Sequence, residues 1–286
     1  MTTLLGLLVG VAGGVLAWRM MRPVFASPLL ARSNYRGHTL PTAGGLVVVL
    51  VALGGEAVIA VALGAGADLD AGNTGPRWTA LGVALGFGFL GLIDDLVGDG
   101  GARGYRGHLT SLLHGELTTG GIKLFGGAAV AVVVAGWVPH EGLGWLFADA
   151  ALIATAANLG NLLDRGPGRT IKVTVTAGLV VILAAGLRAE LVGVALVCGA
   201  GLAMLVPDLR EEEMLGDTGA NVLGGAVGLG VVLVAPSWVR LAVLALVVAL
   251  NLASERVSFT AVIDRTPVLR HLDRAGRLDV PGDGET

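Results

Sequence analysis

Residues 78–97 read WTALGVALGFGFLGLIDDLV, an apolar run whose only charged residues are Asp94 and Asp95, close to its end. About 20 mostly apolar residues cross the hydrocarbon core of a bilayer as a single helix. The run therefore predicts a transmembrane helix. The two adjacent carboxylates in its last turn need a separate explanation.

Similar apolar runs recur along the whole chain of 286 residues, of which 54% are hydrophobic and only 14% are charged. Soluble domains carry about 25% charged residues. We predict about nine transmembrane spans, at residues 3–18, 43–64, 78–96, 120–138, 143–160, 171–187, 189–206, 219–235 and 238–254. The connections are short, so the predicted fold is all-α. It is a polytopic membrane bundle formed by residues 1–260, followed by a C-terminal tail over residues 261–286.

The positive charges are distributed unequally between the two sets of loops. Loops on one side carry 16 of the 19 lysines and arginines, and the other side carries only Arg77, Arg188 and Arg240. Cytoplasmic loops are enriched in these residues. The N-terminus is therefore predicted outside and the C-terminal tail in the cytoplasm, as an odd number of spans requires.

The paired aspartates lie where an isolated helix disfavours them. The C-terminal end of a helix carries partial negative charge, and two neighbouring carboxylates repel each other. A bound cation or substrate would relieve both effects, so we interpret Asp94 and Asp95 as functional. The alternative is that they only mark the point at which the helix leaves the membrane.

Two more polar segments lie at span ends on the same side. MLGDTGANVLGG (214–225) places Asp217 at the start of the eighth span, where an aspartate can also be an ordinary helix cap. NLGNLLDRGPGRTIK (158–172) places Asn158, Asn161 and Asp164 at the end of the fifth, with the asparagines on one helical face. Oxygen ligands of this kind suit Mg²⁺ or Mn²⁺ and not zinc. The residues alone thus predict an oxygen-lined cation site on the cytoplasmic face.

Four segments, taken in order, resemble the motifs of the polyprenyl-phosphate N-acetylhexosamine-1-phosphate transferases. They are the loop Asn34–Gly45 ending LPTAGG, the pair in Ile93-Asp94-Asp95, the segment Asn158-x-x-Asn161-x-x-Asp164, and Leu215-Gly216-Asp217-Thr218-Gly219. Each motif alone is weak. Together they cover nearly the whole chain and lie at the predicted cytoplasmic ends of the spans.

The resemblance implies a specific chemistry. These enzymes transfer a sugar-1-phosphate from a UDP-sugar to a membrane polyprenyl phosphate, release UMP and require Mg²⁺, in cell-envelope glycan synthesis such as that of peptidoglycan. It implies a multi-pass plasma-membrane protein with its active face in the cytoplasm and with Mg²⁺ or Mn²⁺ as cofactor. The expected partners are polyprenyl phosphate, a UDP-sugar and the membrane. A homodimer is compatible with the resemblance, and no nucleic acid is expected.

The resemblance also implies roles for individual residues. Asp94, Asp95 and Asp164 are expected in catalysis, and Asp217 with Asp94 in metal binding. Substrate binding is expected from Asn158, Asn161, Lys123, Arg106, Arg169 and His271. Lys123 lies just inside the fourth span and is one of only two lysines in the chain.

The chain departs from the family pattern at two places. Pro167 stands where the family has a second aspartate, in Asp164-Arg165-Gly166-Pro167-Gly168, and the histidine-rich loop is reduced to Arg270-His271. The changed segment Asp164–Gly168 favours one alternative, a non-catalytic homologue that binds a lipid- or nucleotide-linked ligand or scaffolds an envelope-assembly complex. The retained Asp94, Asp95 and Asp217 argue against it. A transporter is the other alternative. Glu56 and Asp149 inside the spans could suggest ion coupling, but both look solitary and no inverted repeat is visible.

Overall fold

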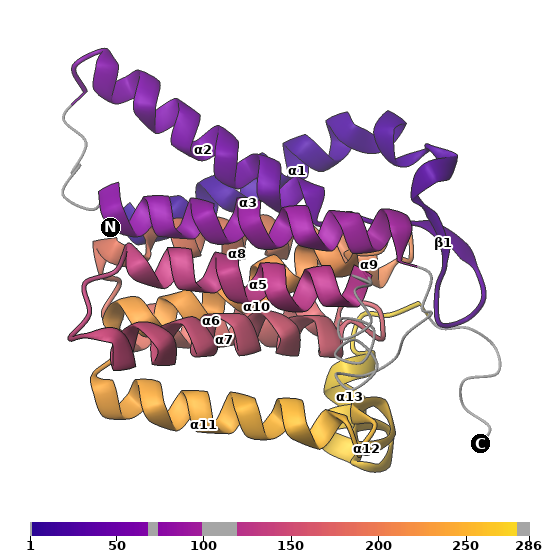
Figure 1. The fold of residues 1–286 in the computed structure, drawn as a ribbon. Coiled ribbons are helices and arrows are strands. Elements are labelled where there is room, and N and C mark those ends of the chain that lie inside the picture. The colour runs from indigo at the N-terminus through magenta and orange to yellow at the C-terminus, as the bar shows by residue number, and fades with distance from the viewer. Residues whose placement is uncertain (1, 68–73, 99–118, 279–286) are drawn as a thin grey trace.

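A computed structural model describes residues 2–67, 74–98 and 119–278, and each of the nine predicted spans falls on a helix. Figure 1 shows the long helices stacked lengthwise in one bundle. They are α1 (Thr2–Phe25), α2 (Leu46–Gly64), α3 (Thr74–Val97), α5 (Thr119–Gly136), α6 (Leu143–Leu163), α7 (Arg169–Ala184), α8 (Val192–Ala203), α10 (Gly216–Val234) and α11 (Ser237–Ser254).

Short elements connect or follow the long helices. They are η1 (Pro28–Leu30), β1 (Ala31–Ser33), β2 (Thr39–Pro41), η3 (Ala189–Leu191), α9 (Leu205–Leu209), α12 (Phe259–Arg265) and α13 (Pro267–Arg274). The antiparallel hairpin β1–β2 was not part of the all-α prediction. Its turn is closed by the side chain of Asn34, whose Oδ1 accepts from the backbone N–H groups of Arg36 and His38, both at 2.9 Å. Asparagine favours such turns because its side chain replaces a backbone acceptor.

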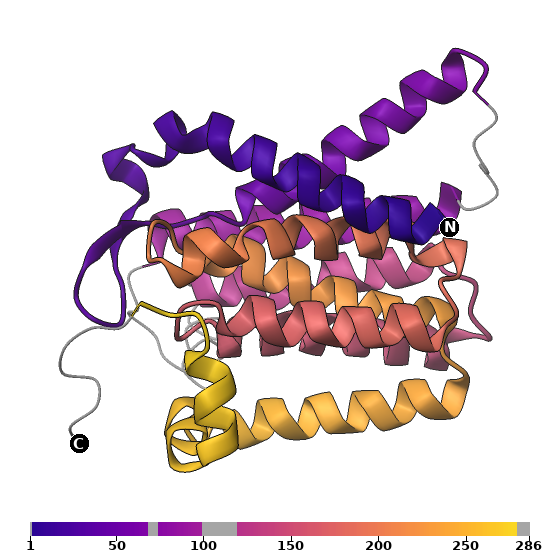
Figure 2. The same cartoon turned by 180° about the vertical axis from the view of Figure 1, so that it is seen from behind.

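The structure confirms a polytopic helical membrane protein. Seven segments are long and apolar enough to cross a membrane: α1, α2, α3, α6, residues 189–209, α10 and α11. The apolar part of α5, Gly120–Gly136, is shorter, and α7 has 16 residues. Nine crossings therefore remain a prediction, as does their orientation. In Figures 1 and 2, α1 begins at one end of the bundle and α12 and α13 lie at the other, as an odd number of crossings requires.

Helix α10 is the most buried of the candidate spans and packs on α2, α3, α6, α7 and α8. Its close approach to α6 depends on small residues. A Cβ added at Gly160 would meet the carbonyl oxygen of Ala220, and one added at Gly224 would meet the carbonyl of Ala156. Small residues let membrane helices pack backbone to backbone. This packing brings the polar end of α6 against the start of α10.

The first turn of α10 also packs closely against the start of α2 and the C-terminal half of α3. A Cβ at Gly45 would meet the backbone N of Gly219, and one at Gly91 would meet the carbonyl of Asp217. Gly216 has a φ of 72°, which disfavours any side chain with a Cβ. Gly45, Gly91 and Gly216 therefore allow three segments of backbone to meet closely around Asp217.

The acids considered for a transporter are not solitary. Glu56 Oε1 lies 3.2 Å from Arg77 Nε, and Asp149 Oδ2 accepts from Arg240 Nη1 at 2.8 Å. The guanidinium of Arg240 also lies 5.3 Å from the ring centre of Trp145. The prediction that these acids lack partners was wrong, because sequence does not show which residues face each other across two helices. Because an arginine balances each acid, the presence of these acids in the spans has a structural explanation and does not favour a transporter.

Candidate functional site

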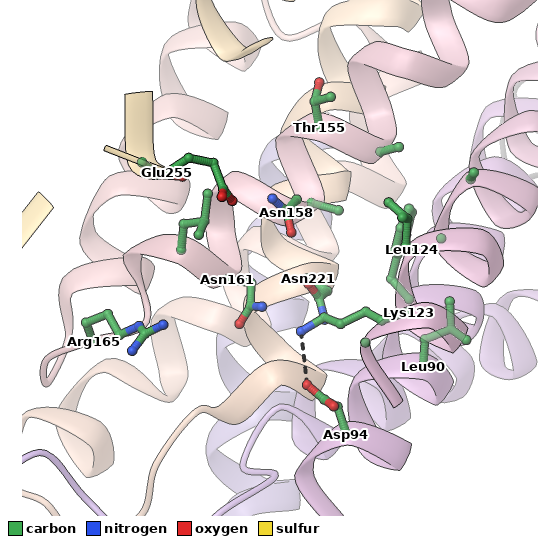
Figure 3. A pocket seen from close by; sticks show the side chains of 18 residues that line it. Leu90, Asp94, Lys123, Leu124, Thr155, Asn158, Asn161, Arg165, Asn221 and Glu255 are labelled. Carbon is green, nitrogen blue, oxygen red and sulfur yellow. Dashed lines mark hydrogen bonds and ion pairs between the residues drawn. The ribbon is translucent and has the colours of Figure 1, made fainter. Parts of the chain in front are cut away.

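Lys123, in the first turns of α5, is the centre of a charged cluster at the end of the bundle where α3 ends and α10 begins. Its Nζ lies 3.4 Å from Asp94 Oδ2 and also contacts Asp217 Oδ2. Figure 3 shows Lys123 reaching across to Asp94. The side chains of Lys123, Asp94 and Asp217 are only 16%, 25% and 24% exposed, so water screens their charges weakly.

Asn161 completes the cluster from α6. With its amide oriented to satisfy both neighbours, Nδ2 donates to Asp217 Oδ1 at 2.6 Å and Oδ1 accepts from Lys123 Nζ at 2.5 Å. Four helices thus each contribute one polar side chain, although Asp94 and Asp217 are far apart in the sequence. The structure brings together four of the predicted site residues.

Asp95 has different partners from its neighbour. Its carboxylate accepts from the backbone N–H groups of Asp217 and Thr218 at 2.9 and 3.0 Å, and from Thr218 Oγ1 at 2.6 Å. Thr42 Oγ1 lies 3.4 Å away. The first N–H groups of a helix have no partner within it, and its N-terminus attracts negative charge. Asp95 therefore caps α10 from α3. The Asp217 side chain is directed instead at Lys123 and Asn161.

A cavity of about 520 Å³ opens beside the cluster. Its polar part includes Asp94, Lys123, Asn158, Asn161 and Arg165. The rest is largely apolar, with contributions from Phe87, Leu90, Leu124, Ala154, Ala157 and Leu162. Figure 3 shows Lys123, Asp94 and Asn161 close together, with Leu90 and Leu124 on one side of them and Arg165 on the other. Asp95 is not part of its lining.

Helix α11 forms one wall of this cavity through Ser254, with Glu255 just after the helix. Its position there is fixed by an amide pair: Asn158 Nδ2 donates to Asn251 Oδ1 at 2.6 Å. Asn251 in turn donates to the carbonyl of Thr155 at 3.0 Å. Asn158 thus both lines the cavity and holds α11. Asn251 was missed by the sequence reasoning, although a buried amide inside an apolar span is a sign of a helix contact.

A second cavity of about 290 Å³ lies under the hairpin. It is lined by Ser33, Asn34, Tyr35, Leu40, Asp164, Arg165, Gly166, Pro167, Asp208, Glu211, Glu213 and Met214. Arg165 lines both cavities, so the turn after α6 separates them. Removal from water, reinforced by the negative charge of Asp208 and of two further aspartates, raises the pKa of the Asp164 carboxyl well above its usual range.

Asp208 is a second residue that the sequence reasoning missed. Its buried carboxylate accepts from the backbone N–H groups of Gly168 at 2.6 Å and Leu215 at 3.2 Å. It thereby ties the turn after α6 to the segment before α10. The only signal in the sequence is its place as the first acid of VPDLREEE (206–213), a run that otherwise resembles a solvated loop.

Two predicted substrate-binding residues lie apart from both cavities. Arg169 is buried and donates to Asp273 at 2.7 and 3.1 Å and to Thr260 at 2.9 Å, so it fastens the tail to α7. His271 is exposed on α13. Arg106 lies outside the described residues. Substrate binding by these three residues therefore stays a prediction.

The side chains of the cluster suit Mg²⁺ only as part of an open site. Within residues 2–67, 74–98 and 119–278, no group of three or more His, Cys, Asp or Glu side chains is placed to hold a metal ion. Mg²⁺, however, is often bound by one or two carboxylates together with waters and substrate phosphates. Asp94, Asp217 and the amide oxygen of Asn161 suit a site of that kind. They do not form a closed metal site made by the protein alone.

The comparison with known proteins agrees with the motifs. No family model matches the chain. The chain is 25% identical over 278 residues to phospho-N-acetylmuramoyl-pentapeptide-transferase from Acetivibrio thermocellus, an alignment that covers 87% of this chain and 78% of that protein. The two proteins are distant homologues over most of their lengths. This confirms the family resemblance that the motifs predicted.

Proposed function

We propose that this protein, a distant homologue of phospho-N-acetylmuramoyl-pentapeptide transferase, transfers a sugar-1-phosphate from a UDP-sugar to a membrane polyprenyl phosphate. The sugar is of the N-acetylhexosamine type, the reaction requires Mg²⁺, and the product serves cell-envelope glycan synthesis. The observation that carries the proposal is the cluster of Lys123, Asp94 and Asp217 beside a partly apolar cavity.

The two cavities suit substrates of different chemistry. The larger one combines apolar helix walls with Lys123 and Arg165, so a lipid phosphate can place its chain against the walls and its charge at the cations. The smaller one is lined by hydroxyl, amide and carboxyl groups, which suit the hydroxyls and base edge of a nucleoside. We assign the acceptor to the first cavity and the nucleotide part of the donor to the second.

The reaction then takes place between the cavities. An oxygen of the acceptor phosphate attacks the phosphorus that carries the sugar, a new P–O bond forms, and the bond to UMP breaks. Lys123 balances the negative charge that gathers on the transferred phosphoryl group and on UMP. Bound Mg²⁺ would neutralise the diphosphate as a Lewis acid, held by Asp94, Asp217 and Asn161. Such reactions depend mainly on positioning and charge.

Asp95 and Asp164 have separate roles in this proposal. Asp95 is a positioning residue, because it fixes the turn of α10 from which Asp217 extends. Asp164 lies at the turn between the cavities, and its raised pKa favours the neutral carboxyl. A neutral carboxyl can donate a hydrogen bond to an anionic oxygen as well as accept one.

We propose that the protein lies in the plasma membrane and that the cluster faces the cytoplasm. Support comes from Arg77, Arg188 and Arg240, which lie toward the end of the bundle opposite the cluster, whereas the basic loops lie on the cluster's side. A reporter fused after Asp70 should be exposed outside, and one fused after Arg106 should remain inside. Both reporters on one side would contradict this orientation.

The activity is tested with purified protein in nanodiscs, Mg²⁺, polyprenyl phosphate and a panel of UDP-sugars that includes UDP-N-acetylglucosamine and the UDP-muramoyl pentapeptide. Release of UMP with one of them is the expected result, and EDTA should stop it. Asp217→Asn should lower the rate about 100-fold or more, as expected for a metal-assisted site. Asp264→Asn, on an exposed tail helix, is the matched control and should keep the rate.

The second candidate is a homologue that binds these ligands without turning them over. The observation that favours it is Pro167, which lines the smaller cavity in place of the family's second aspartate. No UMP from any donor, together with measurable binding of a UDP-sugar, would establish it. Full activity of Asp217→Asn would instead show that Asp217 has no role in the reaction, and it would not contradict the transferase activity.

A further inference from the structure

The tail helices α12 and α13 carry an apolar surface that no other described residue covers. Val268 is 69% exposed, Leu272 is 60% exposed, and Val262 and Leu269 are exposed beside them. Val268 and Leu272 are four residues apart and so lie on one face of α13. Exposed apolar residues gathered on one face indicate an interaction surface.

Another side of α13 is fastened firmly to the bundle. Asp273 is buried between Arg169 and Arg277, with Arg277 Nη2 at 2.6 Å. Lys172 Nζ donates to the carbonyls of Leu272, Asp273 and Ala275 at 3.2, 2.8 and 2.7 Å, and so satisfies the C-terminal end of the helix. The helix is therefore held in a fixed orientation that leaves Val268 and Leu272 exposed.

The connection from α11 keeps these helices near the membrane. Helix α11 is a candidate span that ends at Ser254, and α12 begins at Phe259. The residues between them close the last turn of α11, because the N–H groups of Arg256 and Val257 both donate to the carbonyl of Ala253, at 3.0 and 2.8 Å. In Figures 1 and 2, α13 runs crosswise to the long helices at the end of the bundle, which is the direction of the membrane plane.

The charges around the apolar face suit an anionic lipid surface. Exposed arginines outnumber exposed acids in this segment: Arg256, Arg265, Arg270 and Arg274 against Glu255 and Asp264. Amphipathic helices with apolar residues on one face and basic residues on the other lie in the membrane interface. Each basic residue near an anionic surface adds to the attraction.

We propose that α12 and α13 lie in the membrane–water interface on the side that carries the cluster. Val268, Leu269 and Leu272 are buried at the boundary between headgroups and acyl chains, and the arginines contact anionic headgroups. This proposal does not depend on the transferase assignment. A lipid surface is the occupant that the structure favours, because α11, a candidate span of which only 11% is buried inside the protein, leads into this segment through residues 255–258.

This contact would also act on the candidate site. Arg277 Nε donates to the carbonyl of Pro167 at 3.1 Å, and Arg169, which holds Asp273, begins the helix after the same turn. The turn carries Asp164 and Arg165 into the cavities. Docking of the tail on the membrane therefore fixes the turn that separates the two cavities.

The test uses full-length protein with a nitroxide label on Leu272→Cys, or on Val268→Cys in case the first variant does not fold. The chain's own Cys198 is buried, so labelling is selective. The protein is placed in nanodiscs of zwitterionic lipid, or of zwitterionic lipid mixed with anionic phosphatidylglycerol. Collisions of the label with oxygen and with a water-soluble nickel chelate are measured. Asp264→Cys provides the aqueous reference and Leu50→Cys, on α2, the lipid reference.

The proposal expects the labels at Leu272 and Val268 to be several-fold more accessible to oxygen relative to nickel than the label at Asp264. Anionic lipid should move both labels deeper into the bilayer. The double change Arg265→Gln and Arg270→Gln should reduce this shift. Nickel accessibility equal to that at Asp264 in both lipids would overturn the proposal. Protection from nickel accompanied by spin–spin broadening that disappears on dilution with unlabelled protein would also overturn it, by showing a second copy on this face.

Discussion

The two ends of the helical bundle treat buried charge differently. At the end away from the cavities, each buried acid has its own arginine: Glu56 pairs with Arg77, and Asp149 with Arg240. At the cavity end, one lysine, Lys123, faces a group of carboxylates that includes Asp94 and Asp217. A charge inside a membrane therefore does not by itself mark a functional site. An excess of one sign beside a cavity is a better indicator, because a bound ligand of opposite charge can balance it.

The largest effect should separate these two ends. Asp94→Asn should lower UMP release about 100-fold or more, because it removes charge from the cluster, with no fall in thermal stability measured without Mg²⁺. Asp149→Asn should keep turnover in the protein that remains folded, but should lower the melting temperature, since it leaves the partly buried Arg240 without its counter-charge. The two variants are compared by UMP assay and by thermal unfolding in the same detergent. Equal loss of turnover in both variants would contradict a functional difference between the two ends of the bundle.

The next effect distinguishes the adjacent aspartates. Asp95→Ala should lose both stability and turnover, because α10 loses its cap and Asp217 loses its support; a lost cap costs about 1–2 kcal/mol. From the sequence, both carboxylates were expected to be unfavourable at the end of their own helix, and the capping contacts now restrict that expectation to Asp94. Thermal unfolding without Mg²⁺ measures the difference. A stability of Asp95→Ala equal to that of the wild type would contradict the capping role.

A smaller effect concerns the cation in the cluster. Lys123→Met should bind Mn²⁺ several-fold more tightly, as titrated by electron paramagnetic resonance, because the ammonium group no longer competes for Asp94 and Asp217. The same variant should lose turnover. Lys172→Met is the matched control, since the other lysine of the chain contacts only tail carbonyls among the bonds described here, and its Mn²⁺ affinity should not change. Unchanged or weaker Mn²⁺ binding by Lys123→Met would show that the lysine does not occupy the cation position.

The smallest effect is a pH dependence at the cavity end. Glu213 is buried against Trp18, and burial raises its pKa to about 8. The folded state therefore binds a proton more strongly than the unfolded state, and the stability contributed by this proton is lost as pH rises from about 4.5 to 8. Glu213→Gln should flatten the fall of melting temperature over that range. An unchanged slope would exclude Glu213 as its source.

Much of the fold followed from the sequence because apolar runs of membrane length leave few alternatives. Each predicted span lies on a helix, and the end of α3 meets the starts of α5 and α10 as the motifs indicated. The hairpin was missed because it depends on a local turn at Asn34 and not on hydrophobic periodicity.

The roles within the site were harder to predict. Adjacent aspartates point in different directions on a helix, but their partners lie on other helices whose relative register the sequence does not encode. For the same reason Glu56 and Asp149 looked unpaired. Asp208 escaped notice because its three acidic neighbours 211–213 make it look like part of a solvated loop.

Helix α11 is joined to α6 at both ends, through Arg240 and Asp149 toward one side of the membrane and through Asn251 and Asn158 toward the other. Synthesis runs from the N-terminus, so α6 enters the bilayer before its partners exist. Until α11 arrives, α6 exposes an acid and an amide within the apolar phase. Insertion of the last long helix thus completes both polar contacts at once. A chain that lacks α11 therefore still exposes polar groups of α6 to lipid, and the machinery that removes misfolded membrane proteins can recognise it by them.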